Sequence, residues 1–134
     1  MSTPMYIGPQ PGTDRAYEVF QQTHPGRGSL RVQVSTARGT FPVSGAWVEV
    51  SRVFDGSRRV LYRGMTDNSG IVEKIVLPTL PASYSRQEST AADSGTVYQV
   101  SVYHPGFVPL VDSDVELYDR IETILPVALE PVAR

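Results

Sequence analysis

The chain has 134 residues, enough for one domain with one modest hydrophobic core and too few for a second folded domain. Its formal net charge of -2, with both signs interspersed, excludes the basic footprint of a protein that binds nucleic acid or an anionic membrane. The absence of cysteine excludes disulfides, thiolate metal sites and a cysteine nucleophile.

The first 27 residues are predicted to form an extended arm, because Pro and Gly recur through residues 1–28 at a spacing that forbids a long helix. The arm carries more apolar side chains than a linker needs. Two interpretations stay open: a disordered terminus, or a segment that docks on its own or a neighbouring domain. The candidates for an assembly contact are Tyr6, Ile7, Tyr17, Val19 and Phe20.

Residues 28–134 are predicted to form a β-sandwich, because the hydrophobic pattern changes there to a period of two. Turn signals at 55–57 and 66–70 separate some of the strands. The apolar run that Pro78 closes is compatible with burial on both faces, and 78–95 is a long loop without a period. The expected strands cover 29–36, 46–51, 58–65, 71–77, 97–103, 107–111, 115–118 and 122–129.

Three segments carry a family resemblance by their order: Pro42-Val-Ser-Gly-Ala-Trp-Val-Glu-Val50, Thr66-Asp-Asn-Ser-Gly70 and Val97-Tyr-Gln-Val-Ser-Val-Tyr-His-Pro-Gly-Phe107. Together with the tail at 124–131, they resemble the carboxypeptidase regulatory-like modules, which are transthyretin-like sandwiches related to the collagen-adhesin B-type repeats. A narrower likeness is to modules in spore and cell-wall proteins of Gram-positive bacteria. The resemblance covers residues 28–132. It implies an all-β, Greek-key sandwich of about seven strands and no shared active site.

Catalytic chemistry has few candidates. The only histidines, His24 and His104, each stand directly before a Pro-Gly turn. The acids Asp112, Asp114 and Glu116 alternate along an extended segment, so they are expected to share one solvated face. No enzyme activity and no resident cofactor is therefore predicted.

Two binding sites are the alternatives to a purely structural role for the acidic residues and for Trp47. Ca²⁺ is the cation that oxygen ligands from Asp112, Asp114 and Asp119 would hold. Trp47 lies on the strand face opposite the apolar positions 46, 48 and 50, where it is either a core or subunit contact or a platform for a sugar. Tyr84 and Arg86 in the long loop are the remaining ligand-binding candidates.

The function predicted from these features is that of a structural or interaction protein. The sandwich would be a self-assembling or surface-docking subunit of a bacterial envelope, spore or filament structure, using the arm and the sheet edges. Its partners would be further copies of the chain, in an oligomer or polymer. The alternative is an accessory module that binds glycan or peptidoglycan.

A cell surface, a spore envelope or an extracellular assembly is the expected location. Residues 1–10 lack the basic start and apolar core of a signal peptide, and no apolar run approaches membrane-spanning length. No membrane insertion is therefore expected. Synthesis in the cytoplasm with release outside the general secretory route fits these features.

Overall fold

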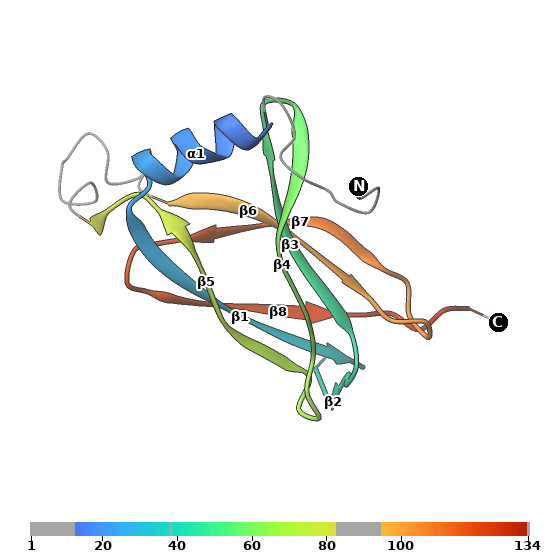
Figure 1. Cartoon of the computed structure of the whole chain (residues 1–134). Coiled ribbons are helices and arrows are strands. Elements are labelled where there is room, and N and C mark those ends of the chain that lie inside the picture. The colour runs from blue at the N-terminus through green and yellow to red at the C-terminus, as the bar shows by residue number, and fades with distance from the viewer. Residues whose placement is uncertain (1–12, 38, 83–94, 134) are drawn as a thin grey trace, which may run out of the picture.

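The computed structural model describes residues 13–37, 39–82 and 95–133, which form two packed β-sheets and one short helix (Figure 1). The elements are α1 (Thr13–Thr23), β1 (Gly26–Thr36), β2 (Phe41–Pro42), β3 (Trp47–Phe54), β4 (Ser57–Met65), β5 (Ile71–Thr79), β6 (Thr96–Tyr103), β7 (Leu110–Leu117) and β8 (Glu122–Ala128). The all-β sandwich expected from the sequence is confirmed.

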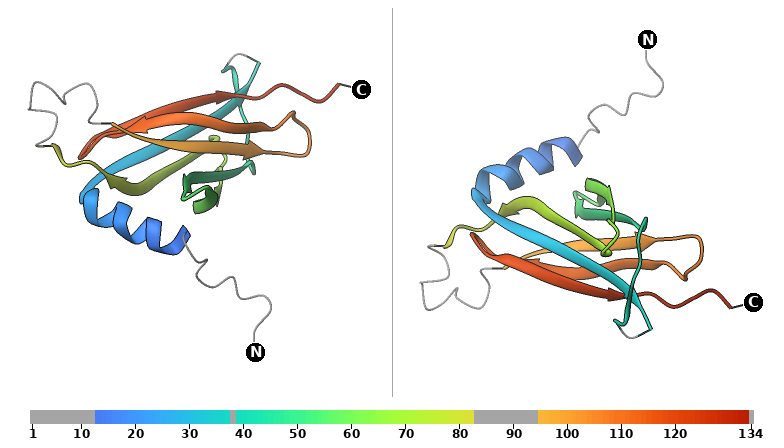
Figure 2. Two further views of the ribbon diagram at one scale, coloured as in Figure 1. Left: turned by 90° about the horizontal axis from the view of Figure 1, so that it is seen from above. Right: turned by 90° about the horizontal axis from the view of Figure 1, so that it is seen from below.

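The two sheets face each other as layers (Figure 2). In sheet A, β1 pairs antiparallel with β5 and β2, and parallel with β8 on its other side. Sheet B is antiparallel, in the order β4-β3-β6-β7. The first and last strands of the sandwich are therefore direct neighbours.

The core lies between the sheets and follows the predicted alternation. Leu30, Val32 and Val34 of β1 are buried, as are Val48 and Val50 of β3. The polar residues between them point away from the core, because successive side chains in a strand face opposite sides. Tyr98 of β6 is also fully buried, and its hydroxyl donates a hydrogen bond to the Pro78 carbonyl, so burial of this ring leaves no orphaned polar group.

Helix α1 corrects the prediction of an extended arm through residue 27. Residues 13–24 contain neither Pro nor Gly, so one short helix fits before Pro25, which cannot continue it. Tyr17 and Phe20 face the sandwich, and Phe20 is 7% exposed within the core. Strand β1 then begins at Gly26. The arm's tip, residues 1–12, lies outside the described residues.

Strand β5 corrects the prediction of two-sided burial. Lys74 has a left-handed φ of 63°, and the pairing shifts so that Arg31 of β1 faces two residues of β5. This β-bulge lets Val72 and Ile75 both reach the core although they are three positions apart. Val76 then points to solvent. The strand also continues through Pro78 to Thr79, beyond the expected end.

The turn over residues 66–70 is confirmed and interlocks with the bend before β3. The Asp67 carboxylate accepts hydrogen bonds from the amides of Ser69 (2.8 Å) and Ile71 (3.0 Å). The buried Thr66 hydroxyl donates to the Val43 carbonyl (2.7 Å) and accepts from the Ala46 amide (2.9 Å). Two of the segments that carry the family resemblance are thus one structural unit.

Candidate functional site: the outer face of sheet B

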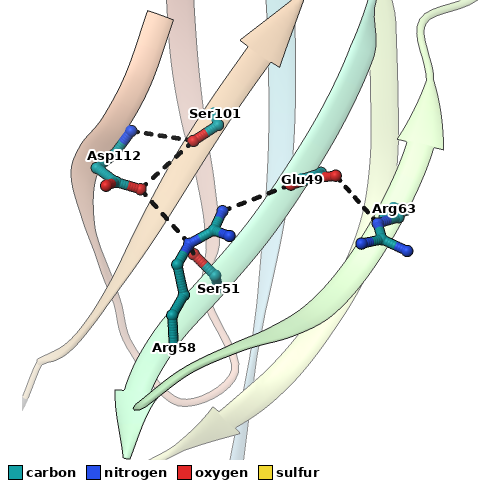
Figure 3. A network of polar contacts seen from close by, with 6 residues as sticks. All are labelled: Glu49, Ser51, Arg58, Arg63, Ser101 and Asp112. Atoms are coloured by element: carbon teal, nitrogen blue, oxygen red, sulfur yellow. Dashed lines mark hydrogen bonds and ion pairs between the residues drawn. The ribbon is translucent and has the colours of Figure 1, made fainter. Parts of the chain in front are cut away.

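A polar row crosses the outer face of sheet B with one residue from each strand: Arg63 of β4, Glu49 of β3, Ser101 of β6 and Asp112 of β7 (Figure 3). The Nε of Arg63 lies 3.0 Å from a Glu49 oxygen. The Ser101 hydroxyl accepts the Asp112 amide at 3.0 Å and lies 3.5 Å from the Asp112 carboxylate. The row therefore begins with a cation at one edge and ends with an anion at the other.

Arg58 holds the middle of this network. Its guanidinium lies 3.4 Å from Glu49, 3.1 Å from the Ser51 hydroxyl and 3.7 Å from Asp112 (Figure 3). Partial desolvation raises the pKa of Glu49, but Arg63 and Arg58, with a hydrogen bond from Trp47, outweigh that effect and leave the pKa below its ordinary value. Glu49 is therefore an anion held between two cations, which does not suit it to act as a general base near neutral pH.

An apolar row lies beside the polar row, and three of its four residues pair in register. Met65 of β4 pairs with Trp47 of β3, which pairs with Tyr103 of β6. Val111 of β7 continues the row out of register, because the bulge at Asp112 leaves Val111 and Asp112 both opposite Ser101 and not opposite Tyr103. The exposed fractions are 56% for Met65, 39% for Trp47, 36% for Tyr103 and 57% for Val111. Exposed large apolar side chains gathered on one sheet face make this face a candidate interaction surface.

Trp47 has the outward orientation that the alternation predicted, and its neighbours were missed. Met65, Tyr103 and Val111 stand far apart in the sequence. The strand register pairs Met65 and Tyr103 with Trp47, and the bulge in β7 leaves Val111 exposed on the same face. Their alternation with buried residues was the available signal for facing outward. Tyr84 and Arg86, the other ligand-binding candidates, lie outside the described residues.

The predicted acids do not converge. Asp114 lies 3.1 Å from the Gln99 amide nitrogen on the outer face, whereas Asp119 lies beyond the other end of β7. Asp119 accepts the backbone amides of Arg27 (2.9 Å) and Ala82 (2.8 Å). Within residues 13–37, 39–82 and 95–133, no three His, Cys, Asp or Glu side chains gather in a metal-binding group. Ca²⁺ binding by Asp112, Asp114 and Asp119 together does not fit this geometry.

Asp119 has a structural role that its charge assists. The hydrogen bond from the Arg27 amide lowers the pKa of Asp119 the most, and the Ala82 amide and the Arg120 guanidinium act in the same direction against desolvation. Its carboxylate ties the start of β1 and the segment after β5 to the turn between β7 and β8.

The two histidines are also accounted for by local structure. His24 stacks on the Phe20 ring at 4.0 Å, and its Nδ1 lies 2.9 Å from the Phe20 carbonyl. Burial lowers the pKa of His24, the Phe20 carbonyl opposes this, and the charge of Arg52 adds to the lowering. The Nδ1 of His104 accepts the Gly106 amide at 3.2 Å within its own turn. The Thr23 hydroxyl also lies 2.9 Å from the His24 Nδ1, but it is held by the Val19 and Phe20 carbonyls at 3.1 Å each, so this contact belongs to the C-terminal end of α1.

The assembly contacts predicted on the arm are corrected where the structure describes them. Phe20 packs edge-on against Phe54 and Tyr98 of its own chain, and Tyr17 against Phe54. The inward-facing Arg52 lies over the Phe20 ring at 4.7 Å. These helix residues therefore close their own core. Val19 is exposed, and Tyr6 and Ile7 lie outside the described residues.

The sheet edges in the described part of the chain are each interrupted. Strand β4 has Leu61 as an extra residue between paired positions, β5 has the bulge at Lys74, and β7 has the bulge at Asp112. Strand β8 carries Pro126, which has no amide hydrogen to donate. Bulges and prolines of this kind oppose the addition of a foreign strand to a sheet edge.

Sheet A carries a groove of 440 Å³. It lies between the β4–β5 turn and β1, and its polar lining comes from side chains such as Gln33, Asn68 and Ser69. The lining includes no aromatic ring and no charged side chain. It therefore has neither a stacking surface for a sugar nor an acid–base pair.

No helix among the described residues is long and apolar enough to span a membrane.

No protein-family model and no curated protein matches the chain. Among solved structures, the minor pilin GBS52 of Streptococcus agalactiae matches 81% of this chain with a TM-score of 0.55 at 13% identity, over 46% of the pilin. The Bacillus anthracis TIE protein matches 80% with a TM-score of 0.53 at 22% identity, over 17% of its length. The chain is a transthyretin-like β-sandwich.

The sandwich also resembles an enzyme. The 3-chlorocatechol 1,2-dioxygenase of Rhodococcus opacus 1CP matches 80% of the chain with a TM-score of 0.53 at 9% identity, over 61% of the enzyme. The chain thus spans less than two thirds of each of these three proteins. Pilins and a dioxygenase share the fold, so the fold alone does not decide the function, and the outer face of sheet B carries the functional argument.

Proposed function

We infer that this sandwich is a structural subunit that works by protein–protein contact in a bacterial surface assembly, and that it is not an enzyme. The observation that carries this inference is the exposed apolar row of Met65, Trp47, Tyr103 and Val111 across all four strands of sheet B. A folded chain that leaves Trp and Tyr side by side at its surface has a surface suited to a partner.

Two features favour contact through a sheet face over contact through an arm or an edge. The helix residues Tyr17 and Phe20 are occupied by their own core, and the described sheet edges at β4, β5, β7 and β8 each carry a bulge or a proline. Pilins from Gram-positive bacteria share the fold, which supports a place in a surface assembly. The proposed role is therefore still that of an assembling or docking subunit, but its contact surface is the outer face of sheet B in place of the arm and the sheet edges.

Sedimentation velocity and electron microscopy of the full chain test this function. We expect species larger than the 14.7 kDa monomer, with a population that grows with protein concentration. A parallel pull-down on isolated bacterial surface fractions tests docking on another structure. A chain that stays monomeric at every concentration and binds none of these fractions would contradict the proposed function.

Binding of cell-wall glycan is the second candidate, because Trp47 and Tyr103 are direct cross-strand neighbours on the outer face of sheet B, with Arg63 and Glu49 beside them. Exposed aromatic rings next to hydrogen-bonding groups suit a sugar ring. Pull-down on purified peptidoglycan, comparing Trp47→Ala with Val76→Ala on the other sheet, separates the two functions. Glycan binding predicts retention that only Trp47→Ala abolishes. Equal failure of wild type and both variants to be retained would exclude it.

A further inference from the structure

The outer face of sheet B is ordered in two directions. Across the strands, the polar row runs from the Arg63 cation at the β4 edge to the Asp112 anion at the β7 edge. Along the strands, the polar row lies beside the apolar row. Both outer side chains of the polar row are accessible, with exposed fractions of 56% for Arg63 and 52% for Asp112. The face is therefore positive at its β4 edge and negative at its β7 edge, and it carries an apolar band beside these charges.

A two-fold axis that runs parallel to the strands, between two stacked sheets, has a definite effect on these rows. It exchanges the β4 and β7 edges and leaves each row at its own height. The apolar row then meets the same row of a second copy. Arg63 meets Asp112 of the second copy, and Asp112 meets its Arg63. One symmetry operation thus satisfies both the apolar band and the charge direction.

We propose that two copies of this chain pack through the outer faces of sheet B about such an axis, with reciprocal Arg63–Asp112 ion pairs. This inference rests on the proposed function as an assembling subunit and names its surface and symmetry. The charge complementarity of the polar row with itself is the reason for choosing a second copy as the occupant. Trp47 and Tyr103 lie near the centre of the contact, where aromatic side chains contribute most.

Arg58 is compatible with this packing although it comes near the axis in both copies. Each Arg58 is already held by Glu49 and Asp112 of its own chain. Across the polar row and Arg58, two cations and two anions give no net charge. The repulsion between the two central arginines is therefore compensated within each copy.

The outer face of sheet A does not meet the same requirements. Its exposed apolar residues Val76 and Ile124 lie on strands at either side of β1, where they pair with Ser29 and Arg31. The polar outer side of β1 therefore separates them, and no continuous apolar row crosses the outer face in the described part of this sheet. Val76 is 57% exposed, close to Met65 at 56%, so it offers a matched control.

The first test compares Met65→Asp with Val76→Asp in the full chain by sedimentation velocity. We expect Met65→Asp to weaken self-association by on the order of tenfold or more, because it places a charge in the apolar contact. Val76→Asp should associate like the wild type. Thermal melts establish that both variants are folded. Equal association of wild type and Met65→Asp would overturn the proposal.

The second test uses charge reversal by mixing. Arg63→Glu places two anions opposite each other in its own dimer, and Asp112→Lys places two cations opposite each other. Each variant alone should associate less well than the wild type. An equimolar mixture should recover association, because the introduced glutamate then faces the introduced lysine and the other pair is native. Asp112→Lys is compatible with its left-handed φ of 53°, since Lys74 and Arg120 already adopt φ of 63° and 62°. A mixture that associates no better than either variant alone would contradict the reciprocal pairs.

A cross-linking test reads the symmetry directly, because the chain contains no cysteine. Strands lie about 4.8 Å apart and packed sheets about 10 Å apart, so Arg63 and Asp112 of facing copies come within reach of a short bis-maleimide. The two Arg63 positions are also displaced sideways by three strand spacings, roughly 14 Å, which puts them about 17 Å apart. A mixture of Arg63→Cys and Asp112→Cys should cross-link. Arg63→Cys alone should not. The reverse pattern would overturn the symmetry.

The outcomes separate this inference from the proposed function. An assembly that forms normally but responds to none of these substitutions leaves the structural role intact and overturns the sheet B contact. A wild-type chain that remains monomeric and still binds a bacterial surface fraction also overturns the contact and keeps docking as the function. A chain that neither self-associates nor binds a bacterial surface fraction overturns both the sheet B contact and the proposed function.

Discussion

The two ends of the sandwich are closed in different ways. At one end, the bend before β3 and the turn before β5 are joined by backbone amides and carbonyls and by the hydroxyls of Thr66 and Ser44. At the other end, α1 lies across the opening, and aromatic rings around Arg52 fill the space beneath it (Figures 1 and 2). The first end depends on hydrogen-bond geometry and the second on side-chain packing.

This difference decides what each end tolerates. The turn at 66–70 has little freedom, since a Cβ added to Gly70 would lie 2.3 Å from the Val34 carbonyl oxygen at a φ of +76°. The helix end also has a close backbone approach, since a Cβ added to Gly28 would lie 2.6 Å from the Tyr118 carbonyl oxygen, but side chains close this end. It is held by the burial of one large ring and by the anchor at Asp119, so its stability should respond to side-chain volume and to pH.

The largest effect is expected at the helix end. Phe20→Ala should lower the free energy of unfolding by about 3 kcal/mol, because it removes a buried ring that contacts Phe54, Tyr98 and Arg52. Val19→Ala on the same helix is the control, and it should change stability by less than about 0.5 kcal/mol because Val19 is exposed. Urea unfolding measures both. Equal effects would mean that α1 does not close the core.

A smaller loss is expected at the hydrogen-bonded end. Thr66→Val keeps the shape of the side chain but leaves the Ala46 amide and the Val43 carbonyl without their buried partner, at a cost of about 2 kcal/mol. Thr66→Ser keeps the hydroxyl and should recover much of that loss. If Thr66→Ser is as unstable as Thr66→Val in the same urea titration, methyl packing and not hydrogen bonding holds this end.

Acid should act on the helix end through Asp119. Because the pKa of this carboxyl is lowered in the folded chain, its contribution is present above the ordinary value of 3.8 and is lost as pH falls through the folded value. Asp119→Asn should lower the melting temperature at pH 6 and narrow its difference from wild type in strong acid. Melting curves from pH 6 to pH 2 measure this. A constant difference would exclude the anchor.

The smallest effect should come from His24. Its pKa is lowered, so the unfolded chain binds the proton more readily, and stability falls with decreasing pH below the ordinary value of 6.5. His24→Gln should remove this part of the pH dependence between pH 7.5 and pH 5. Melting temperatures of the two proteins over that interval give the result. Parallel curves would show that protonation of His24 is not linked to folding.

The sheets were predictable where alternation is regular, and were mispredicted where the backbone departs from it. The buried positions of β1 and β3 follow from period two alone. The bulge at Lys74 changes which residues of β5 face the core, and no local sequence pattern predicts this bulge. The prolines and glycines of residues 1–28, taken as one segment, hide helix α1, because the part of that segment from 13 to 24 is free of both.

The candidate site shows the same division. Trp47 could be placed on the outer face from its own strand, because that requires only the alternation around it. Its apolar neighbours could not be predicted from one strand, since Met65 and Tyr103 join Trp47 through strand register and Val111 is added by a bulge. The separation of Asp119 from Asp112 likewise follows from the length of β7, along which side chains seven positions apart lie far from each other.

The parallel pairing of β1 with β8 has a consequence for how the chain acquires its structure. Strand β1 lies inside sheet A, yet one of its two neighbours is the last strand of the sandwich to be synthesised. Until β8 emerges, one side of β1 has no partner in the native arrangement. Folding must then join segments separated by almost the whole sandwich sequence, which makes loop closure slow. We therefore expect sheet A to complete late, after the local hairpins of sheet B.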